Sequence, residues 1–98
     1  MTKAEIIQNV ADATGLGKRD IEAVFNGIFF QMYSSLKSGE SIFIRGFGTF
    51  NVRERAAKTA RNIAKNTTIT LPPKAVVKFK PCRELINDVS NLKLTNHE

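Results

Sequence analysis

The residues best suited to chemistry are the basic side chains between positions 51 and 80. This segment holds eight lysines and arginines against one acid, Glu54, so its net charge is +7. Residues 1–50 are balanced and residues 81–98 carry −1, which together account for the +6 of the chain. Because so one-sided a segment repels itself, it favours a polyanionic partner over a merely solvated basic surface. The eight residues are Arg53, Arg55, Lys58, Arg61, Lys65, Lys74, Lys78 and Lys80.

Residues for catalysis or metal binding are scarce. The chain has one cysteine, Cys82, and one histidine, His97, and they lie far apart in sequence. No nucleophile and base pair is evident, and no set of Cys and His ligands exists. We therefore expect no enzyme, metal, cofactor or small-molecule substrate. Cys82 is expected to pack as a small apolar residue at a helix start, rather than to act as a reactive thiolate.

Two glycines, Gly46 and Gly48, flank Phe47. This G-x-G is too short to indicate a nucleotide loop, so a tight turn is the favoured interpretation. The exposed N–H groups of such a turn can also hold a phosphate.

Length and composition indicate one globular domain. The 98 residues are 42% apolar and 24% charged, which are globular values. No apolar run approaches the roughly 18 residues that span a bilayer, and the N-terminus lacks a signal-peptide pattern. We expect a soluble cytoplasmic protein with no membrane partner.

The first elements read as two helices. Thr2 and Glu5 fit a capping box, and Gly15 is a good stop. The apolar residues at helical spacing are Ile6, Val10 and Ala13. Gly17 then permits a second helix over 18–37, with Asp20 near its positive end.

The second helix carries more apolar residues than one contact requires. They fill an arc of about 180°, whereas a stripe a little over about 100° suffices for a surface helix. A second copy of the chain is the favoured cover, and a monomer that sandwiches the helix is the alternative. The residues predicted for the core or the dimer interface are Phe25, Ile28, Phe29, Met32, Phe47, Phe50 and Phe79.

The rest of the chain predicts strands and a final helix. Residues 41–45, 67–71 and 75–80 have strand patterns, and a further strand begins within 46–55, after the glycine-flanked turn. Residues 53–61 also suit a helix, but their continuity with the preceding strand favours a long two-stranded ribbon. Pro72 and Pro73 predict an edge or a bulge. Pro81 is expected to open a third helix, whose buried positions are Leu85, Ile86 and Val89, and residues 92–98 to fray.

A two-stranded ribbon is slim enough to enter a DNA groove. By strand parity Arg53, Arg55 and Arg61 share one face and Lys58 lies on the other. On the return strand, Lys74, Lys78 and Lys80 share a face. Asn62 and Asn66 suit the turn at the tip. The lone apolar residue there, Ile63, could serve as a wedge between base steps, as in minor-groove proteins that kink DNA.

The run "GFGTFNVRERAAKTARN" closely resembles the HU and integration host factor family of bacterial DNA-bending proteins. The resemblance continues in "MTKAEIIQNVA", "SGESIFIRGFGTF" and "FKPCRELIND", so it covers nearly the whole chain. It implies an α+β fold, with a helical body of two N-terminal helices and a C-terminal helix. A three-stranded antiparallel sheet would extend into a β-ribbon arm, and two chains would form an intertwined dimer. The body would comprise 1–52 and 76–98, and the arm 53–75.

The resemblance also implies the function and the site. The protein would bind and bend duplex DNA through the minor groove, with little sequence preference, in the bacterial nucleoid. Its partner would be itself or a paralogous subunit. Arm contacts would come from Arg53, Arg55, Lys58, Arg61, Asn62, Ile63 and Lys65, and from Lys74, Lys78 and Lys80 on the return. Gly46, Gly48 and Thr49 would meet phosphate near the arm base, and Lys3 and Arg83 would clamp the flanks.

The chain departs from the family at three places. Ile63 stands where the family has an intercalating proline, Asn66 where it has a glycine, and Cys82 where a glycine is usual. Arg45 resembles the sequence-selective branch, which places a carboxylate two residues earlier. Because Phe43 stands there, a phosphate contact by Arg45 is favoured over base reading. Two other functions stay open: a dimer whose arms grip a protein partner, and a module that accepts structured RNA.

Overall fold

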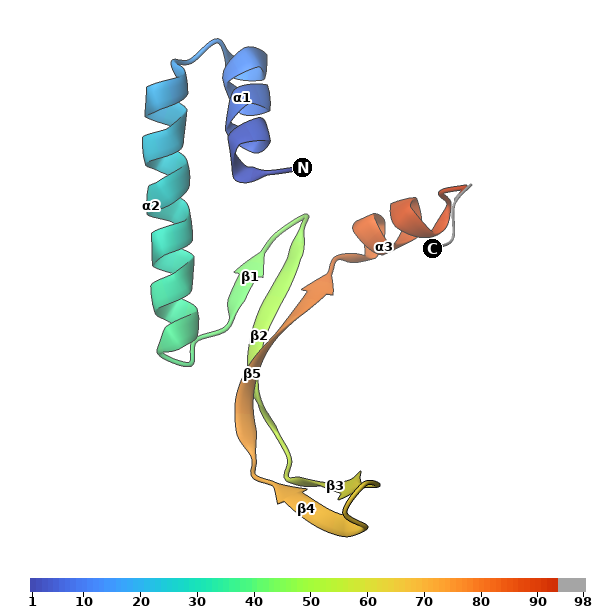
Figure 1. Cartoon of the computed structure of the whole chain (residues 1–98). Coiled ribbons are helices and arrows are strands. Elements are labelled where there is room, and N and C mark those ends of the chain that lie inside the picture. The colour runs from blue at the N-terminus through green and yellow to red at the C-terminus, as the bar shows by residue number, and fades with distance from the viewer. Residues whose placement is uncertain (94–98) are drawn as a thin grey trace.

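Within residues 1–93, three helices and five strands form a body and an extended arm (Figure 1). The structure is a computed structural model and describes residues 1–93, so His97 and most of the predicted frayed tail lie outside the described residues. The elements are α1 (Lys3–Thr14), α2 (Lys18–Lys37), β1 (Ile42–Ile44), β2 (Gly48–Arg55), β3 (Lys58–Asn62), β4 (Thr67–Leu71), β5 (Lys74–Pro81) and α3 (Arg83–Ser90).

The ends of α1 follow the sequence signals. The Thr2 hydroxyl accepts a hydrogen bond from the Glu5 N–H at 3.2 Å. The Glu5 carboxylate accepts from the same hydroxyl at 3.2 Å, instead of from the Thr2 N–H that a full capping box would use. Gly15 ends the helix at φ 74°, where its N–H reaches the Ala11 carbonyl. The chain then turns through Gly17 into α2, whose limits agree with the prediction.

The buried face of α1 is not the apolar row noted at helical spacing. Ile7 and Ala11 form the core that one chain encloses, with 3% and 8% of their surfaces exposed. The residues of that row, Ile6, Val10 and Ala13, are exposed. The reason is that α2 packs on the neighbouring row of α1, one residue further along the helix.

A single chain leaves α2 uncovered. None of its residues is buried, and Phe30 and Tyr33 are 67% and 68% exposed. The radius of gyration is 19.4 Å, against about 13 Å for a compact domain of this length. The accessible surface is 8536 Å², against about 5,600 Å² for a folded monomer of this mass. One chain therefore does not complete its own hydrophobic core.

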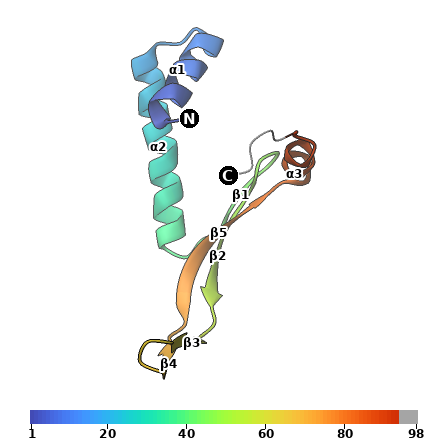
Figure 2. The same cartoon turned by 45° about the vertical axis from the view of Figure 1, so that its right-hand side comes forward.

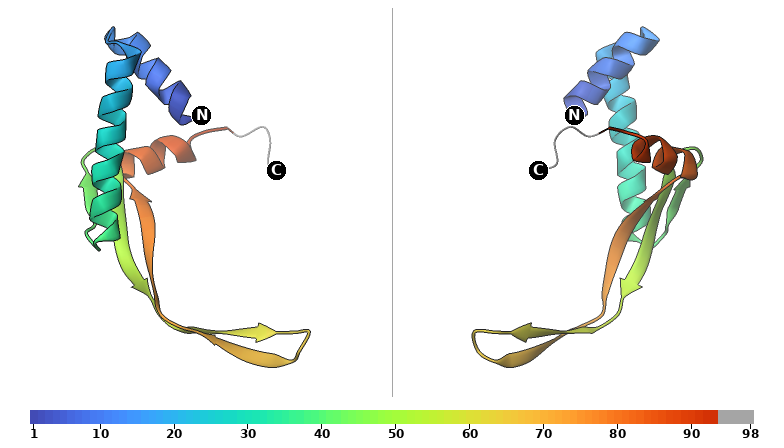
Figure 3. Two further views of the ribbon diagram at one scale, coloured as in Figure 1. Left: turned by 60° about the vertical axis from the view of Figure 1, so that its left-hand side comes forward. Right: turned by 90° about the vertical axis from the view of Figure 1, so that its right-hand side faces the viewer.

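The strands form one sheet and one separate ribbon, both antiparallel. The sheet has the order β1-β2-β5, and the ribbon pairs β3 with β4. Strand was thus the right choice for residues 53–61, apart from an interruption at Ala56 and Ala57. We call the paired β2 and β5 the stem, and β3, β4 and their loop the outer arm. The outer arm turns away from the stem (Figure 3).

The interruption is symmetrical. Arg55 pairs with Lys74 before it, and Lys58 pairs with Leu71 after it. Two residues on each strand are therefore unpaired, Ala56 and Ala57 facing Pro72 and Pro73. Because a bulge needs an extra residue on one strand, the prolines mark a break in both strands and not a bulge. The other predicted possibility, an edge, is confirmed, because β5 lies at the end of the sheet and β4 belongs to a two-stranded ribbon.

The third helix begins at Arg83, two residues after Pro81, the residue predicted to open it. Pro81 is the last residue of β5 and pairs with Gly48, so it does not open the helix, and Cys82 is the N-cap. The predicted buried positions are only partly covered: Leu85 is half-buried, and Ile86 and Val89 are exposed. The cause is that α3 leaves the sheet away from α2, so neither α1 nor α2 covers its apolar face (Figure 2).

Candidate nucleic-acid interface

The turn between β1 and β2 forms the arm base. Gly46 has φ 82°, and the Phe47 N–H donates to the Ile44 carbonyl at 3.0 Å, which closes the turn. A Cβ on Gly48 would lie 2.5 Å from the Lys80 carbonyl oxygen and 2.7 Å from the Phe79 ring. The tight turn predicted from the two glycines is confirmed, and each glycine has its own steric reason.

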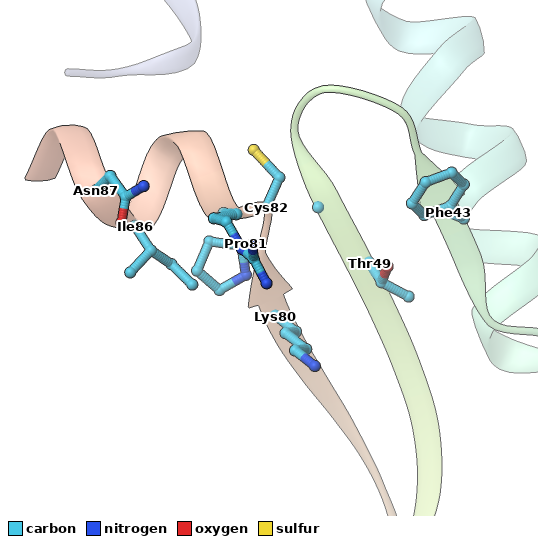
Figure 4. Close-up of a pocket in the computed structure, with 9 residues that line it drawn as sticks. Phe43, Thr49, Lys80, Pro81, Cys82, Ile86 and Asn87 are labelled. Carbon is cyan, nitrogen blue, oxygen red and sulfur yellow. The ribbon is translucent and has the colours of Figure 1, made fainter.

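A hydrogen bond ties this turn to α3. The Cys82 N–H donates to the Phe47 carbonyl at 2.8 Å. An open pocket lies at the junction and is lined by Gly48, Thr49, Lys80, Arg83 and five further residues. Figure 4 shows Lys80 and Thr49 on neighbouring strands below the start of α3, with Phe43 on the β1 side. Cys82 is half-buried in this junction, which agrees with a packing role.

The register of the stem gathers five cations on one face. Four directly opposed pairs between β2 and β5 make up this face: Thr49–Lys80, Asn51–Lys78, Arg53–Val76 and Arg55–Lys74. Because directly paired residues lie on the same side of an antiparallel sheet, the predicted groups from the two strands form a single surface. We call Arg53, Arg55, Lys74, Lys78 and Lys80 the basic face.

The opposite face of the stem is apolar near the body. It carries the pairs Phe50–Phe79 and Val52–Val77. The Phe79 ring centroid lies 4.8 Å from that of Phe50 and 5.3 Å from that of Phe47. Since Phe47 and Phe79 stay exposed, this cluster has room for a further partner. On α2 the ring centroids of Phe25 and Phe29 lie 4.5 Å apart, in a stacked arrangement. Their predicted role in the core or the dimer interface is compatible with such a partner.

Arg55 makes a contact that the sequence did not predict. Its Nη2 donates to the Pro72 carbonyl at 3.3 Å, and its Nε is buried without a partner. The guanidinium therefore lies against the break between the stem and the outer arm. No motif in the sequence signals this contact, because it depends on how the two strands turn at the prolines.

The arm tip is a four-residue loop, Ile63 to Asn66. Asn66 has φ 52°, in the left-handed region, which confirms its predicted turn role. The Asn62 Oδ1 accepts from the Lys65 N–H at 3.3 Å, and the Asn66 N–H donates to the Ile63 carbonyl at 3.4 Å. Arg61 Nη2 donates to Asn66 Oδ1 at 2.8 Å. Ile63 itself is 88% exposed.

The remaining predicted site residues are spread over the surface. Arg45, Lys58 and Lys65 are exposed. Arg61 has the same strand parity as Arg53 and Arg55, but it lies beyond the break in the outer arm. Because the outer arm turns away from the stem, Arg61 does not continue the flat surface of the basic face. Arg83 is the first residue of α3. Lys3 is the first residue of α1, and its Nζ lies 5.7 Å from the centroid of the Phe25 ring, a cation–π contact.

Other kinds of site find no support in the part of the chain that the structure describes. Residues 1–93 contain no group of three or more His, Cys, Asp or Glu side chains that could hold a metal ion. No helix in this range is long and apolar enough to cross a bilayer.

Comparison with known proteins gives consistent results. The family model described as "Bacterial DNA-binding protein" matches residues 1–90. The integration host factor subunit beta of Marinobacter nauticus is 40% identical over 92 residues, covering 93% of this chain and 94% of that protein. DNA-binding protein HU 1 of Bacillus subtilis is 38% identical over 90 residues, covering 92% and 98%.

Two solved structures are also similar. An Anabaena HU–DNA cocrystal structure has a TM-score of 0.81 and 27% identity, and covers 94% of this chain and 100% of that one. A mutant of HU from Thermotoga maritima has a TM-score of 0.68 and 32% identity, and covers 91% and 99%.

Proposed function

The chain belongs to the bacterial DNA-binding protein family of HU and integration host factor, and from that premise we propose that it binds duplex DNA as a dimer and bends it through the minor groove. Members of this family are architectural DNA-binding proteins and not enzymes. The dimer, the groove and the residues that contact DNA are the parts that we propose here. The observation that carries the DNA contacts is the basic face of the stem.

The charge on the stem favours a phosphate backbone as its ligand. Five cations lie on one side of a two-stranded structure whose other side is apolar toward the body. Lysine and arginine on such a surface neutralise phosphates and release condensed counterions, which gives affinity with little sequence preference. Thr49 and the N–H groups around Gly46 and Gly48 would add contacts at the arm base, near Arg45. Lys3 and Arg83, each at the first residue of a helix, would hold the flanks.

The outer arm suits the minor groove. It is two strands wide, carries Lys58, Arg61 and Lys65, and ends in a bare apolar side chain, Ile63. Proteins that bind the minor groove insert such wedges between base steps and kink the duplex by roughly 20–90°. We assign that role to Ile63, with Asn62 beside it.

A dimer would supply what one chain lacks. The uncovered faces of α2, α3 and the Phe47–Phe79 cluster carry large apolar side chains that are 42% to 68% exposed. A symmetric partner that covers them would create an obligate interface, a class that buries about 2,000–5,000 Å² or more. Each chain would then act as one domain, with residues 53–75 as its arm. Either an identical chain or a paralogous subunit fits this description, and the bacterial nucleoid is the location that fits the ligand.

The decisive test measures affinity for a random duplex as a function of salt. We expect log K to fall steeply and linearly with log salt concentration, because several phosphates are neutralised. Lys78→Gln should weaken binding and reduce the slope by about one for each arm engaged. Lys37→Gln, a charge change at the end of α2 away from the basic face, is the matched control. A slope near zero, or preferential binding of structured RNA or of a protein in excess duplex, would remove the proposal.

A bending measurement tests the wedge separately. Energy transfer between dyes at the two DNA ends reports the bend at saturating protein. Ile63→Ala should reduce the bend more than it reduces affinity, whereas Arg61→Ala should reduce affinity. Equal bending by Ile63→Ala and the wild type would exclude insertion by Ile63.

A further inference from the structure

We propose that the hydrogen bond between Arg61 and Asn66 is a brace that holds the arm tip closed and fixes Ile63 for insertion. Arg61 is then a positioning residue as well as a cation near DNA. The insertion step rests on the proposed function, whereas the brace itself belongs to the free protein. The two can therefore be tested apart.

Three hydrogen bonds close the tip, and the one between the side chains of Arg61 and Asn66 is the shortest. The two bonds that involve backbone N–H groups measure 3.3 and 3.4 Å, longer than the usual range of about 2.7–3.2 Å for an N–H···O bond. The bond from Arg61 Nη2 to Asn66 Oδ1 measures 2.8 Å, which is typical of a charge-assisted donor. It also spans the loop, since Arg61 lies in β3 and Asn66 directly precedes β4.

Asn66 serves two purposes at once. Its backbone adopts φ 52°, a conformation that asparagine tolerates better than most residues other than glycine. Its side chain supplies the acceptor for Arg61, which a glycine could not. Asn66 thus provides both the turn and one half of the brace.

An arginine suits the other half. Its guanidinium carries five N–H donors in a fixed fork, so one bond to Asn66 leaves the others for phosphate oxygens. A lysine would offer a single flexible charge. Arg61 can therefore bond to Asn66 and contact DNA at the same time.

Ile63 depends on this closure for its position. It is 88% exposed, so packing contributes little to its position. It also lacks the ring with which proline fixes φ. The placement of the wedge thus comes from the loop backbone that the brace restrains, and a loop ordered in advance loses less entropy on insertion.

The first test uses the free protein. Backbone ¹⁵N relaxation would be measured for Ile63, Ala64 and Lys65, with Thr59 and Thr70 in the same arm as internal references. Asn66→Gly keeps the left-handed turn and removes the acceptor, so the loop order parameters should fall below about 0.6 while the references hold. Asn66→Asp keeps an acceptor and should retain wild-type order. Unchanged order in Asn66→Gly would overturn the brace.

The second test uses DNA bending at saturating protein. Asn66→Gly should lower the bent fraction several-fold while its affinity stays within about threefold of the wild type. In an Ile63→Ala background, where no wedge remains, Asn66→Gly should cause no further loss. In an Ile63→Pro background it should also have little effect, since the proline ring now restrains the loop.

The outcomes separate the two proposals. If Asn66→Gly loosens the tip but bends DNA as well as the wild type, the positioning role is wrong and DNA bending stands. If its loss of bending is just as large in the Ile63→Ala background, the effect does not pass through Ile63 and the inference fails. If the wild type does not bend DNA, bending and the positioning role both fail, and relaxation still decides whether the brace exists.

Discussion

Arg55 donates a hydrogen bond from Nη2 to the carbonyl oxygen of Pro72 at 3.3 Å, across the break between the stem and the outer arm. The break leaves four residues without ladder pairing, two of which are prolines without an N–H. This side-chain bond therefore links the strands where the backbone ladder does not. A residue that charge alone assigns to DNA contact thus also connects the two halves of the arm.

We predict that Arg55→Lys loosens the break while it preserves the charge. Amide hydrogen exchange at Lys58, Leu71 and Lys74, which are paired on either side of the break, should accelerate about three- to tenfold, because a typical hydrogen bond contributes about 0.5–1.5 kcal/mol net. The salt slope of DNA binding should stay the same. Arg53→Lys, on the same face but without this bond, is the control. Equal exchange rates in the two variants would show that the Arg55 contact has no structural effect.

The two glycines of the arm base should respond differently to substitution. Gly48→Ala would crowd the Lys80 carbonyl and the Phe79 ring, so the free energy of unfolding should fall by about 1–3 kcal/mol. Gly46→Ala would meet no neighbouring atom, but an alanine at φ 82° is strained, so the free energy of unfolding should fall by about 1–2 kcal/mol. Gly46→Asn should recover part of that loss. Urea unfolding at a fixed protein concentration measures all three, and a harmless Gly48→Ala would contradict the close approach.

A charge on the uncovered face of α2 should prevent association. Ile28→Asp should lower the free energy of unfolding by about 3 kcal/mol or more, because it would bury an unpaired carboxylate at the interface. The wild-type melting temperature should rise with protein concentration. Ile63→Asp, an equivalent change at the arm tip, should leave both properties unchanged. A concentration-independent melting temperature, with monomers in sedimentation, would exclude the dimer.

The start of α1 offers a local test of stability. Thr2→Ala removes the acceptor for the Glu5 N–H and should cost about 1 kcal/mol of unfolding free energy. Thr2→Ser keeps the hydroxyl and should be nearly neutral. Thermal unfolding at one protein concentration compares them, and equal stability of the two variants would mean that this cap contributes nothing.

The limits of the first two helices and the approximate strand positions could be predicted because their signals are local. Gly15, Gly17 and the Thr2 cap define the first two helices, and alternating residues define the strands. The basic face was predictable in part, because parity groups the residues of each strand. The pairing between the strands, which joins the two groups, is a tertiary property.

The buried faces were harder to predict. Apolar spacing cannot tell which of two neighbouring rows α2 covers, so Ile7 and Ala11 were missed. It also cannot tell that α3 turns away from α2. The bonds of Arg55 and Arg61 had no sequence signal, since arginine in a basic ribbon is expected to face phosphate. Each bond depends on where the chain bends.

The symmetry of the break limits how the length of this arm can evolve. The pairing register of the stem continues unchanged into the outer arm, because each strand contributes two residues to the break. Deleting Ala57 alone would slip β3 by one position against β4 and move Arg61 to the opposite side of the ribbon. A longer or shorter reach that keeps every side chain on its present side therefore requires matched changes of two residues on each strand. Single-residue insertions and deletions should be tolerated mainly in the tip loop, because a change of length between Asn62 and Thr67 leaves the pairing of β3 with β4 as it is.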